Sequence, residues 1–198
     1  DAIFRQYGVH RAVTTEDLVD IAYAAIKGRK PTGRRLGLVT ISGGVGVLMA
    51  DAAEDCGLDV APMPAKAQAS LTDLIPFAAP RNPVDVTAQI LNELDKLPQF
   101  FSTLIVEGKY DTVLAFFTSG ASTKTSAAKF LAAIQQMRQE HPEQFIVLSL
   151  LANEDEVKSY EELGFPVFPD ASRAVAAIAA VIRFVEAHDR LASRDQLT

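Results

Sequence analysis

Short, unbroken apolar runs alternate with longer stretches of helical periodicity along most of this chain. The apolar runs predict strands at residues 36–41, 58–61, 111–118, 145–151 and 167–168. The stretches between and after them predict helices at residues 45–56, 68–74, 93–106, 123–139, 155–163 and 172–188. Strands buried on both faces read as continuous apolar runs, and strand–helix–strand repetition gives a parallel sheet. We therefore expect an α/β fold with a flavodoxin-like, doubly wound sheet of five strands in the order 2-1-3-4-5.

A helical extension precedes this alternation. Tyr7-Gly8 predicts the end of one helix and Thr15 the N-cap of the next, whose expected apolar face consists of Leu18, Ile21, Ala22, Ala25 and Ile26. We accordingly divide the chain into the end of a preceding subdomain with a helix and linker (1–33), the flavodoxin-like domain (34–190) and a polar tail (191–198). The opening DAIFRQYGV looks like the middle of a helix, so we expect further chain upstream.

Composition and charge narrow the classes of partner. The 198 residues carry a net charge of −6 and no basic stripe, which argues against nucleic acid as a ligand. The basic run KGRKPTGRR fits a solvated linker, or it helps to attract phosphate-bearing ligands. The longest apolar run, at 174–182, is too short to span a bilayer, no signal peptide is present, and a single cysteine excludes an internal disulfide. We expect a cytoplasmic protein that does not bind membranes.

The most informative loop is the glycine-rich turn Ser42-Gly43-Gly44-Val45-Gly46, which joins the first strand directly to a helix. A helix N-terminus presents unpaired N–H groups and a partial positive charge, which together suit phosphate. Alternatively, the glycines serve only the tight turn. The spacing excludes a Walker A loop, because no Gly-Lys-Ser/Thr follows, and it excludes the GxGxxG fingerprint of dinucleotide binding.

Two further loops should meet this turn, because ligands in such sheets lie outside the carboxyl ends of the strands. The first contains Asn82, Asp85 and Thr87, of which Asp85 and Thr87 either contact a ligand or cap local amides. The second, Ser119-Gly120-Ala121, is a plain turn or a second amide surface facing the first. No histidine stands in a catalytic pattern and no metal-ligand spacing occurs, so we assign neither catalytic nor metal-binding residues.

Taken together, these loops resemble the NDP-forming acyl-CoA synthetases, the superfamily of succinyl-CoA synthetase and ADP-forming acetyl-CoA synthetase. The matching pieces, in order, are DAIFRQYGV, LGLVTISGGVGVLMADAAEDCGLDV, NPVDVTA, YDTVLAFF and GFPVFPDASRAVAAIAAVIRF, and they cover nearly the whole chain. The resemblance implies a ligase domain of an enzyme that converts acid, CoA and ATP to acyl-CoA, ADP and phosphate through a phosphohistidine. It also implies that the turn at 42–46 stabilises the phosphohistidine, while the loops at 82–87 and 119–121 shape the site.

The same resemblance implies that this chain binds no cofactor itself, whereas the parent enzyme uses CoA, ATP or ADP, and Mg. Its expected partners are the CoA-binding and ATP-grasp domains or subunits of that enzyme, and a phosphate-like anion. The family's phosphorylated histidine lies just before the segment matching DAIFRQYGV, so no residue here corresponds to it, and we expect the chain alone to be inactive. Two alternatives stay open: a non-catalytic ligase-like domain of a protein acetyltransferase, and a regulatory interaction module.

Overall fold

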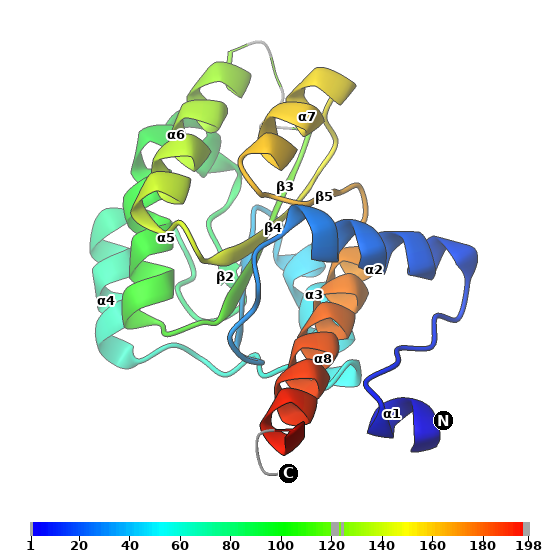
Figure 1. Cartoon of the computed structure of the whole chain (residues 1–198). Helices are drawn as coiled ribbons and strands as arrows, with labels where there is room; N and C mark the ends of the chain where they lie inside the picture. Colours follow the sequence, from blue (N-terminus) through cyan, green and yellow to red (C-terminus); the bar gives the residue numbers. More distant parts are fainter. Residues whose placement is uncertain (1, 120–122, 124, 196–198) are drawn as a thin grey trace.

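The computed structural model describes residues 2–119, 123 and 125–195 and consists of a parallel sheet with helices on both faces (Figure 1). The five strands are ordered β2-β1-β3-β4-β5, and every neighbouring pair is parallel. Their bounds are β1 Leu36–Thr40, β2 Val84–Asp85, β3 Thr112–Thr118, β4 Phe145–Leu150 and β5 Val167–Phe168. The predicted fold class and strand order are therefore confirmed.

The helices alternate with these strands along the chain. The α-helices are α1 Ala2–Gln6, α2 Thr15–Lys27, α3 Gly43–Asp55, α4 Ala65–Leu74, α5 Leu97–Ser102, α6 Ala127–Glu140, α7 Glu154–Glu162 and α8 Ala171–Asp195. Before and after α5 lie the 3₁₀-helices η1 Ala88–Asn92 and η2 Leu94–Lys96 and the π-helical turn η3 Thr103–Glu107. Two apolar clusters fill the space between sheet and helices, one under α4 to α7 and the other under α3 and α8.

The prediction of a strand at 58–61 is wrong. Only Asp59 pairs with the strand region, through a single bridge to Arg35. The chain then leaves the sheet, because the side chain of Asp59 accepts a hydrogen bond from the Ala61 N–H (2.9 Å) and Pro62 has no N–H to offer a neighbouring strand. The second strand instead forms inside the predicted loop 82–87, where Val84 and Asp85 pair with Val39 and Thr40.

Several predicted helix bounds also differ from the structure. The single helix expected at 93–106 is broken into η2, α5 and η3, with Pro98 in the first turn of α5. The N-cap of α2 is Thr14, whose hydroxyl accepts a hydrogen bond from the Asp17 N–H (3.0 Å), rather than Thr15. The last helix, expected at 172–188, continues to Asp195 and so takes in residues that the sequence suggests as a tail.

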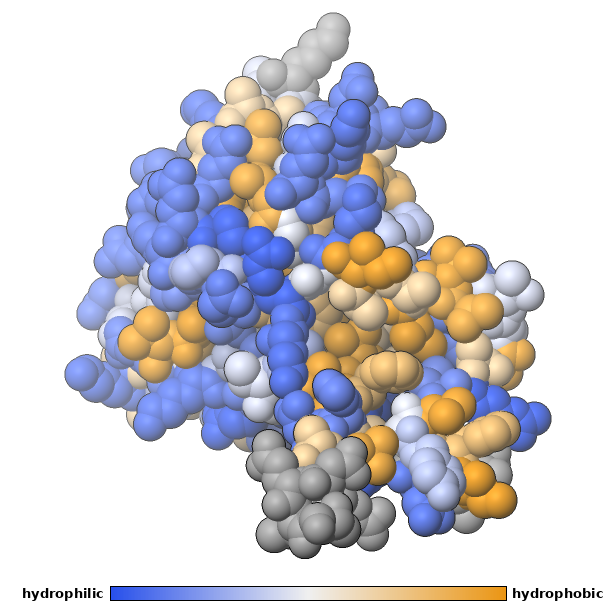
Figure 2. All heavy atoms as spheres, viewed as in Figure 1, coloured by the Kyte–Doolittle hydropathy of each residue, from blue (hydrophilic) through white to orange (hydrophobic). Residues whose placement is uncertain are grey.

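Of the apolar face predicted for helix α2, only Ile21 is buried. Its buried residues are Asp20, Ile21 and Ala24, whereas Leu18 and Ile26 are 58% and 78% exposed. The orientation is held by polar contacts, since Arg173 at the start of α8 donates two hydrogen bonds of 2.8 Å to Asp20. Figure 2 shows the result, with apolar side chains gathered over α2 and the N-terminal segment.

Candidate functional site

The glycine-rich turn lies at the carboxyl edge of the sheet, directly after β1. Thr40, the buried last residue of that strand, organises it: its hydroxyl donates to the Ser42 carbonyl (2.8 Å) and accepts from the Ser42 N–H (2.9 Å). The Ser42 carbonyl then accepts the first bond of α3 from the Gly46 N–H (3.0 Å). Sequence reasoning missed Thr40, although a threonine that ends the apolar run LGLVT was the available signal.

The start of α3 is open. Gly43 and Gly44 are exposed, and a Cβ added at Gly44 would meet nothing within 4 Å. Among the described residues, none accepts a hydrogen bond from the amides of Gly43, Gly44 or Val45, and the Ser42 hydroxyl makes no capping bond. Because these amides carry the positive end of the helix dipole, the turn can receive an anion.

Gly46 has a different role. It is buried, and a Cβ there would lie 3.1 Å from the Thr40 Cγ2 and 3.4 Å from the Pro83 Cβ. Glycine at this position therefore lets α3 approach the 82–87 loop closely. The alternative reading of the glycines as structural thus holds for Gly46, while the open position is Gly44.

Asp85 brings a negative charge to the same helix end. Its Oδ2 lies 3.1 Å from the position that a Cβ would take at Gly43, and its Oδ1 accepts a hydrogen bond from the Thr87 N–H (2.8 Å). A carboxylate here stabilises the N-terminus of α3 and disfavours a second anion close to Gly43. An anion is therefore best accommodated on the Gly44 side of the turn.

The other residues of the 82–87 loop are bound within the protein. The side chain of buried Asn82 accepts from the Leu38 N–H (2.8 Å) and donates to the carbonyl oxygens of Leu36 (2.9 Å) and Ala61 (3.3 Å). The hydroxyl of Thr87 accepts from the Gln89 N–H (3.3 Å) at the start of η1. Both side chains hold the loop in place.

The third predicted loop is described only in part. Ser119 is exposed and directly follows β3, whose Phe116 is in register with Thr40 of β1, so it lies at the same edge of the sheet. Gly120 and Ala121 lie outside the described residues. Among the described residues, no hydrogen bond joins Ser119 to the glycine turn.

The pair Ser102–His141 is not arranged as in a catalytic triad. The Ser102 hydroxyl lies 2.6 Å from the His141 Nε2, but the nearby carboxylate of Glu140 accepts from that hydroxyl (3.0 Å) instead of orienting the ring as the acid of a catalytic triad does. Within residues 2–119, 123 and 125–195 there is no group of metal-binding side chains and no helix long and apolar enough to cross a membrane.

Comparisons with known proteins give a family match over most of the chain. Residues 36–192 match the family model described as Ligase-CoA domain. The chain is 25% identical over 183 residues to the alpha subunit of ADP-forming acetate–CoA ligase I of Pyrococcus furiosus, a match that covers 92% of this chain and 40% of that protein. The chain therefore spans less than half the length of this relative.

Solved structures show the same fold. A crystal structure of a Pyrococcus horikoshii OT3 protein superposes with a TM-score of 0.77 at 24% identity, over 94% of this chain and 43% of that one. The dinucleotide-forming acetyl-coenzyme A synthetase 1 of Ca. Korarchaeum cryptofilum, in complex with phosphate and ADP, gives a TM-score of 0.74 at 20% identity, over 98% and 42% of the two chains.

Proposed function

Because the chain belongs to the Ligase-CoA domain family, we propose that it is the ligase domain of a longer ADP-forming acyl-CoA synthetase. Its relative from Pyrococcus furiosus is an alpha subunit that is ADP-forming and acts on acetate and CoA, and the chain matches 40% of that subunit. The proposed reaction of the parent protein converts a carboxylic acid, CoA and ATP into acyl-CoA, ADP and phosphate. Nucleotide and CoA are bound by other domains or subunits of that protein, with Mg as the companion of the nucleotide.

The proposed role of this domain is to stabilise a phosphohistidine carried by a neighbouring segment. The observation that carries the proposal is the open N-terminus of α3, where the amides of Gly43 to Val45 have no described acceptor and Gly44 faces free space. The phosphoryl oxygens would accept hydrogen bonds from these amides on the Gly44 side, and the Ser42 hydroxyl would supply a further donor. His10 does not fit as the phosphorylated residue, because it lines a hollow with Arg34, which precedes β1, whereas the turn follows β1.

The free energies of anion binding favour a site that this domain shares with another domain. One helix N-terminus contributes about 0.3–1 kcal/mol to a nearby anion, and up to about 2 kcal/mol in partly buried geometry. Millimolar binding already requires about 4 kcal/mol, so the turn alone holds free phosphate weakly. It is suited to a phosphoryl group that is tethered to protein and contacted from a second side by another domain.

The contact with those domains is proposed to include the exposed face of α2. An apolar helix face of Leu18, Ala22, Ala25 and Ile26 is in contact with solvent in this chain, while the opposite, partly charged face packs on α8. Contiguous exposed apolar patches commonly mark protein contacts. The relatives are more than twice as long as this chain, so the parent protein has the material to cover the face.

The test compares two variants at the open position of the turn. In the parent protein incubated with radiolabelled ATP, Gly44→Asp should lower the acid-labile phosphoenzyme at least about fivefold, because the new carboxylate occupies the anion position. Gly44→Ala keeps the amides without adding charge and should leave the phosphoenzyme level unchanged. Asp85→Asn, which removes a nearby negative charge, should raise it. Undiminished phosphoenzyme in Gly44→Asp would rule out the proposed role.

A further inference from the structure

Two threonines with strained backbones lie at the edge of the sheet that carries the glycine turn. Among the described residues other than glycine, positive φ angles occur at Thr87 (52°), Thr118 (51°) and Lys109 (56°). For a β-branched residue such an angle is a marked outlier, because the side chain crowds the backbone. Thr87 combines it with a ψ of 168°, a conformation close to one that is almost confined to glycine. Backbone strain of this kind persists only where surrounding contacts enforce it, and it concentrates at functional sites.

The two threonines flank the glycine turn. Thr40 of β1 is in register with Asp85 of β2 and with Phe116 of β3. Two residues beyond these partners the chain reaches Thr87 and Thr118, just as it reaches the first residue of the glycine turn two residues beyond Thr40. The strain therefore lies on both sides of the start of α3.

The backbone of Thr87 holds the side chain of Asp85. Its N–H donates to the Asp85 Oδ1 (2.8 Å), while Oδ2 lies 3.1 Å from the position that a Cβ would take at Gly43. The backbone of Asp85 is fixed separately, because its N–H and its carbonyl both bond to the backbone of Ala79 (3.2 and 2.8 Å). The carboxylate can therefore leave the glycine turn without disturbing the sheet.

The strain at Thr87 weakens this hold. Because the conformation of Thr87 costs free energy, the Asp85 carboxylate is held less firmly than it would be by an unstrained residue. A phosphoryl group carries more negative charge and three acceptor oxygens, so it interacts more strongly with the positive end of α3 than a carboxylate does. Release of Asp85 would let Thr87 relax, and it would free the Gly43 side of the turn in addition to the open Gly44 side.

We propose that Thr87 is a positioning residue, whose strained backbone keeps the Asp85 carboxylate at the start of α3 as a displaceable occupant of the anion position. In the empty site the carboxylate faces the positive helix end, and an arriving phosphoryl group replaces it there. The inference rests on the proposed function, since it assigns the order in which two anions use the same helix end.

The test is Thr87→Gly in the parent protein, with the acid-labile phosphoenzyme formed from radiolabelled ATP as the readout. Glycine adopts the same conformation without strain, so Asp85 is held more firmly and the phosphoenzyme should fall at least about threefold. The isolated chain should keep or gain stability in urea, because the strain is removed. In an Asp85→Ala background, adding Thr87→Gly should give the same phosphoenzyme level as Asp85→Ala alone, because no carboxylate is left to displace.

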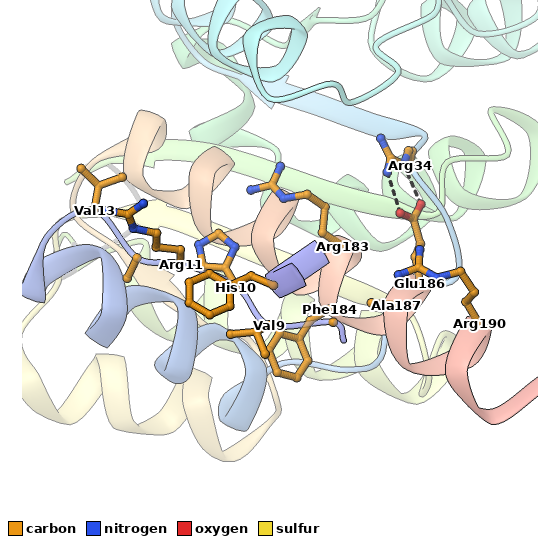
Figure 3. Close-up of a pocket in the computed structure, with 13 residues that line it drawn as sticks. Val9, His10, Arg11, Val13, Arg34, Arg183, Phe184, Glu186, Ala187 and Arg190 are labelled. Atoms are coloured by element: carbon orange, nitrogen blue, oxygen red, sulfur yellow. Dashed lines mark hydrogen bonds and ion pairs between the residues drawn. The ribbon is translucent and has the colours of Figure 1, made fainter. Parts of the chain in front are cut away.

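Lys109→Gly is the matched control, because it also relieves a positive φ at an exposed residue other than glycine. Lys109 precedes β3 and so lies at the amino edge of the sheet, opposite to the glycine turn. Figure 3 shows a hollow at that edge, where Arg34, just before β1, binds Glu186 of α8. The control should leave the phosphoenzyme unchanged. Thr87→Val keeps the branched side chain but removes the hydroxyl that accepts from the Gln89 N–H (3.3 Å), and it should lower the phosphoenzyme less than Thr87→Gly does.

Three results would overturn the proposal. The first is an undiminished phosphoenzyme in Thr87→Gly while Gly44→Asp lowers it, which would leave the proposed function standing. The second is a lower phosphoenzyme in Thr87→Gly together with a clear loss of stability, because Thr87 would then only support the fold. The third is an equal effect of Thr87→Gly with and without the Asp85 carboxylate. If Gly44→Asp also leaves the phosphoenzyme undiminished, the proposed function itself fails.

Discussion

The side-chain oxygen of Asn82 accepts a hydrogen bond from the Leu38 N–H (N to O distance 2.8 Å), while its side-chain nitrogen donates one to the Leu36 carbonyl. Beside Leu36 and Leu38, the buried Asn82 side chain thus makes the hydrogen bonds that a neighbouring strand would make. Further along β1, the strand β2 itself pairs with Val39 and Thr40. This contact ties the loop that carries Asp85 to the strand that carries the glycine turn. The geometry of the candidate site therefore depends on a residue that does not touch the anion position.

Replacing Asn82 by alanine should destabilise the chain by about 2–4 kcal/mol. The substitution leaves the Leu38 amide and the Leu36 carbonyl buried without their present partner, and each such group costs about 1–3 kcal/mol. Urea unfolding followed by circular dichroism measures the change. Arg81→Ala, at the exposed preceding position, should stay within about 0.5 kcal/mol of the wild type. A loss below about 1 kcal/mol in the Asn82 variant would contradict this account.

The two glycines at the start of α3 should respond differently to alanine. Gly44→Ala adds a methyl group to free space and should be neutral or stabilise by up to about 1 kcal/mol. Gly46→Ala brings a methyl group 3.1 Å from Thr40 and 3.4 Å from Pro83, and should cost about 1–3 kcal/mol. Thermal and urea unfolding of the two variants measure the difference in stability. Equal stabilities would show that the close packing of Gly46 against Thr40 and Pro83 is unimportant.

The Arg34–Glu186 pair predicts a small loss of stability in acid. Hydrogen bonds from Arg34 hold the pKa of Glu186 below its ordinary 4.5 in the folded chain. Its contribution is therefore complete above about pH 5 and is lost as the pH falls through the lowered pKa. Both side chains are 40% or more exposed, so the contribution is at most about 1 kcal/mol.

Urea unfolding of the wild type and Glu186→Gln, measured from pH 7 down to about pH 3, tests this pair. The wild type should be more stable near neutrality, and the difference should shrink at the acid end. Molar salt should reduce the difference at pH 7, because the pair is accessible to ions. A difference that grows in acid would show that the carboxylate is not stabilised by Arg34.

The central sheet was predictable from sequence because its inner strands are continuous apolar runs. Residues 36–41, 111–118 and 145–151 coincide closely with β1, β3 and β4, since strands covered by helices on both faces need no polar positions. The edge strand β5 was predicted at residues 167–168, but the other edge strand, β2, was not predictable. Val84 and Asp85 are only two residues within a polar, proline-containing loop, and they pair with β1 because Asn82 anchors that loop.

The candidate site was predictable to a similar degree. The glycine-rich turn lies where the sequence places it, at the carboxyl edge of the sheet. The distinction between an open Gly44 and a packed Gly46 depends on Thr40 and Pro83, which contact the turn only in the folded chain. Likewise, the bonds that Asn82 makes to the backbone of β1 span more than 40 residues, a separation that no local pattern reveals.

Charged substitutions on the exposed apolar face of α2 should disturb the contact with other domains without destabilising this chain. Leu18→Lys with Ile26→Lys should leave the free energy of unfolding of this chain within about 0.5–1 kcal/mol of the wild type, because both side chains already contact solvent. In the parent protein, the same two substitutions should weaken the contact with a neighbouring domain, because that contact would bury two charges. The segment around residues 28–35 should then become accessible to proteases.

Two control variants test whether these effects are specific to the exposed face of α2. Ile21→Lys alters a buried position of the same helix and should destabilise the isolated chain itself. Val106→Lys changes a side chain that is 62% exposed but lies far along the sequence in η3, and should affect neither property. If the Leu18 and Ile26 variant of the parent protein resists proteolysis as the wild type does, this face of α2 contacts no other domain, and the partly charged packing of α2 on α8 is then the whole of its role.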